Sequence, residues 1–275
     1  MATWQELMTT GKLLFLNIGA EGQQTYLVDA SEIPRPLFPE IDVAVEAMWS
    51  PDGTQIVFTG NDEKQGYKIY LANADGSNAR KLMDEQPGYN FRPSWIPDGN
   101  HIFFMSNRDN NLEIYEVNVD GTGLTNLTNH EGNDSNPNLS PDGSTIAFVS
   151  DRLGYPSLFF MDADGSHVRQ VVDEKWRPVW PHWSPDGSRL LFASDHEGAS
   201  HFYTLAGEGS EPQLVTKDAG DHIEPYWLDN ERVIYATGYG VAWDLYVMNV
   251  DDGSVIQLTD TPGPSERYPS WIANQ

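Results

Sequence analysis

The residue types that most often carry out chemistry are few in this chain. Cysteine is absent, so the chain has no thiol nucleophile, no disulfide and no cysteine-ligated metal. No G-x-S-x-G segment supports a serine hydrolase. The glycines follow turns instead of a strand-to-helix junction, so they do not form a phosphate loop. What remains is a set of seven histidines, at positions 101, 130, 167, 182, 196, 201 and 222.

Some of these histidines, together with several carboxylates, make one candidate catalytic site. Histidine and carboxylate side chains are common ligands of zinc and other transition metals. A metal-dependent carbohydrate-active enzyme, either a lyase or a hydrolase, is therefore one functional alternative, although a regular set of channel histidines is missing. No other cofactor is expected. The candidate metal ligands are His222, Glu224, Asp134 and Glu46.

The elements that position these residues are set by an internal repeat. A turn motif of the form W-S-P-D-G recurs, and its first residue, Trp or Leu, stands at positions 49, 95, 139, 183, 227 and 271. The spacing is 46 residues once and 44 residues four times. Each copy predicts a short strand, a tight Pro-Asp-Gly turn, an apolar strand, a polar loop, a third strand, a second glycine turn and a fourth strand. Four short strands in about 44 residues predict one blade of a β-propeller.

The chain ends are out of phase with this repeat. Residues 12–17 match the second strand of a blade, and residues 268–272 match a first strand that no blade follows. We therefore expect residues 268–272 to supply the innermost strand of the N-terminal blade, which leaves no open radial edge. The predicted fold is an all-β, six-bladed β-propeller with four antiparallel strands per blade. Residues 11–275 form this single domain, and residues 1–10 form an arm or a short helix that caps one face.

Further short segments recur at equivalent places in the repeat. They are Ser106-Asn107-Arg108, Ser150-Asp151-Arg152, Ile69-Tyr70, Ile114-Tyr115, Met248-Asn249, Leu127-Thr128 and Leu258-Thr259. With these segments and the W-S-P-D-G turn, the repeat resembles the WD40-like repeat of the TolB family. The resemblance covers residues 11–273 and implies the six-bladed propeller of TolB and of tricorn-type and prolyl-oligopeptidase-type proteases. The N-terminal α/β domain and signal peptide of the TolB pattern, and the catalytic domain of the proteases, have no counterpart here, so the resemblance implies a propeller-only relative.

Positions that differ between blades point to a ligand site at one mouth of the channel. The residue before the proline of each innermost strand varies, and the loops between second and third strands reach the same face. The alternative is that these residues cap strands and bond to neighbouring blades; for Arg108 and Arg152 we expect an ion pair with an acid of an adjacent blade. The candidate ligand-binding residues are Glu46, Arg92, Asn136, Trp180, His182, Glu224, Tyr268, Arg108, Arg152 and Trp243.

The charge of the chain narrows the class of partner. Lys and Arg number 16 against 41 Asp and Glu, so the formal net charge is −25. Such a surface repels phosphate backbones and anionic lipids, so neither nucleic acid nor membrane insertion is expected. The sequence predicts a monomeric, non-catalytic propeller that binds a peptide or protein partner at the channel mouth. A scaffold without a ligand at the mouth is a further alternative.

The compartment is predicted from the N-terminus alone. Residues 1–10 contain neither a cationic region nor an apolar core, so they do not read as a secretory signal. The sequence as it stands therefore predicts a cytoplasmic protein, and a periplasmic one if a leader has been removed.

Overall fold

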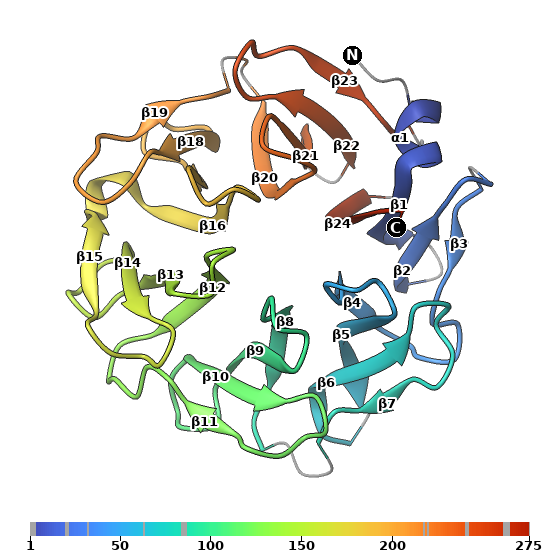
Figure 1. The fold of residues 1–275 in the computed structure, drawn as a ribbon, viewed down its shortest axis with the longest axis horizontal. Helices are drawn as coiled ribbons and strands as arrows, with labels where there is room; N and C mark the ends of the chain where they lie inside the picture. Colours follow the sequence, from blue (N-terminus) through green and yellow to red (C-terminus); the bar gives the residue numbers. More distant parts are fainter. Residues whose placement is uncertain are drawn as a thin grey trace.

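The computed structural model describes residues 4–19, 22–31, 33–62, 64–83, 87–216, 218, 220–239, 242–260 and 265–274. These residues form six four-stranded antiparallel sheets, which are arranged as blades around a central axis (Figure 1). The prediction of an all-β, six-bladed propeller is confirmed.

The blades are numbered by their order along the chain, with the innermost strand given first. Blade 1 consists of β24 (Ser265–Ala273), β1 (Gly11–Gly19), β2 (Gly22–Val28) and β3 (Arg35–Pro36). Blade 2 consists of β4 (Ala44–Trp49), β5 (Gln55–Asp62), β6 (Gly66–Asn73) and β7 (Arg80–Lys81). Blade 3 consists of β8 (Asn90–Trp95), β9 (His101–Ser106), β10 (Glu113–Asn118) and β11 (Thr125–Asn126).

The second half of the ring repeats this arrangement. Blade 4 consists of β12 (Asp134–Leu139), β13 (Thr145–Ser150), β14 (Ser157–Asp162) and β15 (Arg169–Val172). Blade 5 consists of β16 (Pro178–Trp183), β17 (Leu190–Ser194), β18 (His201–Leu205) and β19 (Gln213–Leu214), and a 3-10 turn, η1 (Glu174–Trp176), precedes it. Blade 6 consists of β20 (Asp221–Trp227), β21 (Arg232–Tyr239), β22 (Ala242–Asn249) and β23 (Val255–Gln257).

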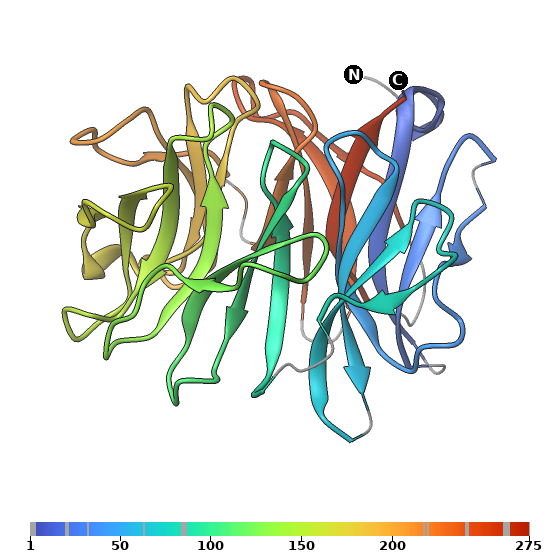
Figure 2. The same cartoon turned by 60° about the horizontal axis from the view of Figure 1, so that its bottom comes forward.

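The ring closes through the two ends of the chain, as predicted. Strand β24 pairs antiparallel with β1, and Trp271 lies opposite Leu13 in this register. The paired segment begins at Ser265, three residues before the predicted start. Helix α1 (Trp4–Thr10) lies beside this closure, on the side of the ring where β24 ends (Figure 2). Its Leu7 and Met8 are buried against Leu13 and Trp271.

The core lies between the blades. The second strand of a blade packs against a neighbouring blade on both faces, so it is apolar along its length instead of alternating. Strand β13, for example, is buried from Ile146 to Ser150. The repeated tryptophan also links neighbours: the indole of Trp95 donates to the carbonyl of Met48 at 3.2 Å, and that of Trp227 donates to His182 at 2.9 Å. This regular packing holds the six innermost strands at fixed positions around the channel.

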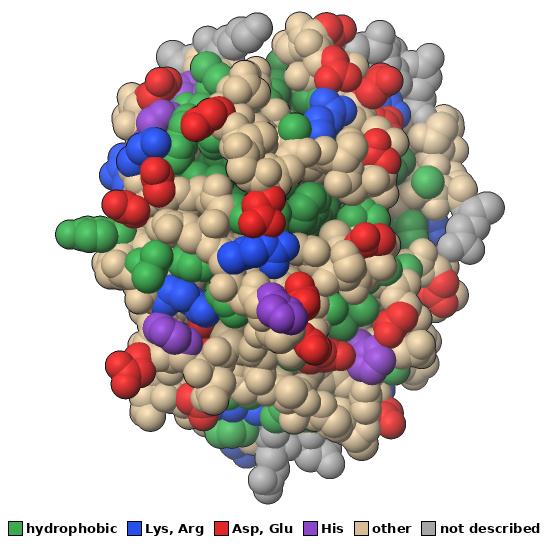
Figure 3. All heavy atoms as spheres, turned by 60° about the vertical axis from the view of Figure 1, so that its left-hand side comes forward, with side chains coloured by type: hydrophobic (Ala, Val, Ile, Leu, Met, Phe, Trp, Pro, Cys, Tyr) green, Lys and Arg blue, Asp and Glu red, His purple; other side chains and the backbone are tan. Residues whose placement is uncertain are grey.

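The face of the molecule seen in Figure 3 carries its negative charge in dispersed form. On the side of blades 4 and 5, acidic side chains lie among lysine, arginine and histidine and do not gather into one patch (Figure 3). Within the described part of the chain, no helix has the length and apolar character needed to cross a membrane.

Candidate functional site at the channel mouth

The six ring residues predicted from the repeat share one backbone conformation. Their φ angles are 56° at Glu46, 53° at Arg92 and Asn136, 51° at Trp180, 55° at Glu224 and 50° at Tyr268. Each stands at a break in the pairing of the innermost strand with the second strand, which marks a β-bulge. A left-handed conformation costs a non-glycine residue about 1–2 kcal/mol. The fold therefore maintains six strained positions of varied side chain at one level of the channel.

Arg92 connects three other members of this ring, which are defined here as the ring residues 46, 92, 136, 180, 224 and 268. Its guanidinium donates to Oδ1 of Asn136 at 3.0 Å and to the hydroxyl of Tyr268 at 3.2 Å. Its Nε lies 3.5 Å from the carboxylate of Glu46. Burial alone would lower the pKa of Arg92, but Glu46, Tyr268 and Glu224 outweigh it and raise the pKa. Arg92 thus stays charged and bridges the channel from blade 3 to blade 1.

Two ring glutamates have the same role in different blades. Glu46 accepts a hydrogen bond from the backbone N–H of Arg92 at 2.7 Å, and Glu224 accepts one from the backbone N–H of Tyr268 at 2.8 Å. Each glutamate therefore ties its own blade to the next blade. Glu224 also pairs with Arg267 at 2.5 Å, and burial raises the pKa of this glutamate. Through these contacts the two glutamates connect neighbouring blades, which is the structural role that was expected as the alternative to ligand binding.

The ring residues and the residues that follow them, Ala47 in blade 2 and a proline in each other blade, line a cavity of about 130 Å³. His182 also lines it, and burial lowers the pKa of His182 to about 4, so its imidazole is neutral near pH 7. Tyr226 lies beside it, with ring centroids 5.0 Å apart. Ligand pockets usually measure about 300–1,000 Å³. The cavity has room for a few waters or one small side chain, so a larger ligand needs further surface.

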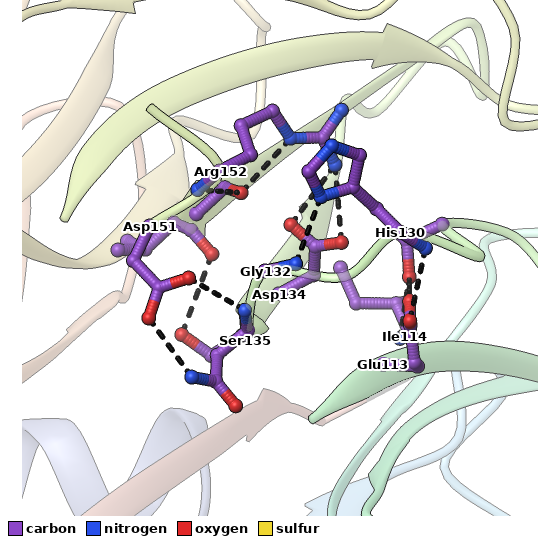
Figure 4. Close-up of polar contacts among 12 residues, drawn as sticks. Glu113, Ile114, His130, Gly132, Asp134, Ser135, Asp151 and Arg152 are labelled. Atoms are coloured by element: carbon purple, nitrogen blue, oxygen red, sulfur yellow. Dashed lines mark hydrogen bonds and ion pairs between the residues drawn. The ribbon is translucent and has the colours of Figure 1, made fainter. Parts of the chain in front are cut away.

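Arg152 and Arg108 lie outside the cavity, in the loops that follow second strands. Nη2 of Arg152 forms an ion pair with both carboxylate oxygens of Asp134, whose side chain is fully buried, at 2.9 and 3.0 Å (Figure 4). The predicted ion pair is present for Arg152, although its acid belongs to the same blade. Arg108 instead donates to the amide oxygen of Asn90 at 2.8 Å and stacks on Tyr115. Both arginines therefore hold their own blade together.

Of the four candidate metal ligands, Glu46 and Glu224 line the cavity, whereas Asp134 and His222 do not. Among the described residues, no group of three histidine, aspartate or glutamate side chains is placed to hold a metal ion. Glu46, Asp134 and Glu224 each bond to an arginine, and His222 lies 2.7 Å from Asp218. Burial lowers the pKa of His222.

Trp243 is half-buried and packs with the core cluster of the closure. The guanidinium of Arg267 lies 5.8 Å from its ring centroid. Gly240 and Val241, which precede it, lie outside the described residues. Trp243 therefore packs against the closure of the ring.

Two grooves next to the ring were not anticipated from the sequence. The larger, of about 610 Å³, spans blades 1 to 3 and includes Tyr67, Tyr89, Arg267 and the ring residues Glu46 and Tyr268. The smaller, of about 440 Å³, includes Tyr155, Arg177 and the ring residue Trp180. The one sequence feature that points to the larger groove is the position of Arg267 directly before the ring residue Tyr268.

Comparison with known proteins agrees with this geometry. The family described as the TolB β-propeller domain matches residues 42–180, which is just over half of the 275 residues. The chain belongs to the TolB β-propeller family. The TolB structure of Acinetobacter baumannii superposes with a TM-score of 0.81 at 21% identity, covering 95% of this chain and 66% of that one. At this identity the likeness concerns the fold alone.

Curated relatives match shorter segments. An uncharacterised protein of Agrobacterium fabrum is 34% identical over 80 residues, which are 29% of this chain and 27% of that protein. The Tol-Pal system protein TolB of Bordetella pertussis is 33% identical over 54 residues, which are 20% of this chain and 12% of that protein. The matched segment is thus about a quarter or less of the length of each relative.

Proposed function

We propose that this chain is a non-catalytic TolB-like propeller that binds a peptide or protein segment at the channel mouth. The observation that carries the proposal is the ring of six bulged, left-handed residues with varied side chains. Strained backbone that a fold retains at the same place in every repeat is a pointer to function. If the ring served only to connect blades, similar side chains would be expected in each blade, as they are found at the Pro-Asp-Gly turns.

The proposal also includes the type of partner and the cellular compartment. The similarity to Tol-Pal system proteins supports a protein partner. Of the two compartments expected from the sequence, the cytoplasm and the periplasm, this similarity supports the periplasm. No observation favours the metal-dependent carbohydrate-active alternative, because its four candidate ligands bond to separate partners. A scaffold without a ligand at the mouth could have its mouth filled by its own N-terminal arm, but helix α1 (Trp4–Thr10) contributes no residue to the lining of the cavity.

Trp180 offers the sharpest test, because it belongs to both the cavity and the smaller groove. A library of random displayed peptides is selected on the immobilised full chain, and the selected peptides are then titrated against variants. We expect Trp180→Ala to weaken binding about tenfold or more. Leu124→Ala, at a 39% exposed leucine in the turn that precedes β11, is the control and should leave binding unchanged. Peptides that bind both variants as tightly as the unaltered protein would refute a mouth site, provided that circular dichroism shows both variants folded.

A further inference from the structure

Exposed aromatic side chains are concentrated at the mouth of the channel. Tyr67, Tyr89 and Tyr155 are 39%, 52% and 69% exposed, and they are the aromatic residues that the described part of the chain exposes to this degree. All three line the two grooves beside the ring. Exposed tyrosine at a concave surface is typical of interaction sites, because it contributes a large contact area and few rotatable bonds.

The larger groove is preformed. Gly66 has a φ of 75°, and a Cβ atom at this position would lie 2.3 Å from Cε1 of Tyr89, so the tyrosine ring rests on the glycine backbone. The ring centroids of Tyr67 and Tyr89 are 6.2 Å apart. The backbone N–H of Tyr89 donates to Oδ1 of Asn107 at 2.7 Å. The two rings therefore hold an open, apolar wall without a ligand.

The loops around the grooves carry uncompensated negative charge. The mouth loops are the loops that surround the channel mouth and the two grooves. Among their described residues, Lys175 and Arg177 pair with Asp173 and Asp195, and Lys64 is the one exposed lysine or arginine that has no carboxylate partner. Exposed carboxylates of the same loops form no ion pair with a described cation. They include Asp42, Glu131, Glu174, Asp221 and Asp260. Charge complementarity therefore favours a cationic partner.

We propose that the ligand is an extended, basic partner segment with an aromatic or proline side chain. That side chain lies against Tyr67 and Tyr89, and flanking lysine or arginine side chains face the rim carboxylates. Aromatic-lined grooves recognise extended segments in this way. The volumes agree, because the groove of about 610 Å³ accommodates such a side chain and the central cavity of about 130 Å³ does not. This inference rests on the proposed function and adds the chemistry of the partner.

The same displayed library tests the inference through the composition of the selected peptides. We expect enriched peptides to carry a net positive charge and at least one Tyr, Phe, Trp or Pro. Their association rate should fall several-fold between 50 and about 500 mM NaCl, because salt screens electrostatic steering. The double variant Tyr67→Ala/Tyr89→Ala should weaken binding about tenfold or more.

A pair of glycine variants separates the groove from backbone strain. Gly66→Ala displaces the ring of Tyr89 and should weaken binding. Gly99→Ala is the matched control, because its φ of 68° imposes a similar strain while a Cβ atom there meets nothing within 4 Å. Equal binding by these two variants would contradict a role for the Tyr89 wall.

The outcomes distinguish the inference from the proposed function. Acidic or neutral peptides that are lost with Trp180→Ala would overturn the basic partner and leave the mouth site intact. Peptides that bind every variant equally would overturn both. A library that yields no enriched peptide would overturn recognition of an extended segment.

Discussion

Arg152 donates two hydrogen bonds to the buried carboxylate of Asp134, at 2.9 and 3.0 Å. In the preceding blade, 44 residues earlier, Arg108 donates to the amide oxygen of Asn90 at 2.8 Å. One blade thus contains an ion pair where its neighbour contains an arginine and a neutral acceptor, and burial lowers the pKa of Arg108. The repeat supplies two versions of one interaction within the same protein.

This pair predicts opposite responses to two single-atom changes. Asp134→Asn should lower the free energy of unfolding by about 3 kcal/mol, because it removes the counter-charge of a poorly solvated guanidinium. Asn90→Asp supplies the missing counter-charge in blade 3, so it should leave stability unchanged or raise it. Urea denaturation at pH 7 measures both. Equal destabilisation by the two variants would show that the charge of the acceptor is unimportant.

The blades and the closure could be predicted from the sequence because they depend on local repeats. Trp49, Trp95 and Trp183 fix the register of three blades, and the phase of residues 12–17 assigns β24 to blade 1. The ring was found by the same reasoning, but its left-handed backbone was not, because no glycine marks those positions. The groove of Tyr67 and Tyr89 could not be predicted either, since these tyrosines do not recur and meet across two blades.

Removal of Trp271 should weaken the closure of the ring. Its side chain is 8% exposed and packs against Leu13 and the helix residue Met8. Trp271→Ala should lower the free energy of unfolding by about 3–5 kcal/mol, the usual cost of removing a buried aromatic side chain. Deletion of residues 268–275 removes most of β24 as well and should cost more. Thermal and urea denaturation measure both changes.

The control for this prediction lies at the outer edge of the neighbouring blade. Val255 is 47% exposed on β23, so Val255→Ala should change stability by no more than about 0.5 kcal/mol. An unchanged melting temperature after deletion of residues 268–275 would contradict closure by β24.

The left-handed backbone of the ring predicts an unusual order of substitutions at Asn136. Both Asn136→Gly and Asn136→Val remove the hydrogen bond to Arg92, so their difference reports the backbone. The valine variant should be less stable by about 1 kcal/mol, because a β-branched residue is strained at a φ of 53°. At the exposed strand residue Gln213 the order should reverse, since valine favours strands and glycine weakens them. The same order at both positions would contradict a strained ring.

The buried imidazole of His182 predicts that acid destabilises the fold. Burial lowers the pKa of His182 to about 4, whereas the unfolded chain has a histidine pKa of about 6.5. Between these values the unfolded state binds a proton that the folded state does not, so stability falls as pH falls through this window and levels off below about pH 4.

The side chain borders a cavity, and we expect a loss of about 1–3 kcal/mol between pH 7 and 4 from this residue. His182→Gln should lose correspondingly less stability over this range. The residual loss in the variant includes His222, because burial lowers its pKa as well. Unfolding free energies of both proteins at pH 7 and 4.5 provide the measurement, and identical losses would show that His182 is readily protonated in the folded state.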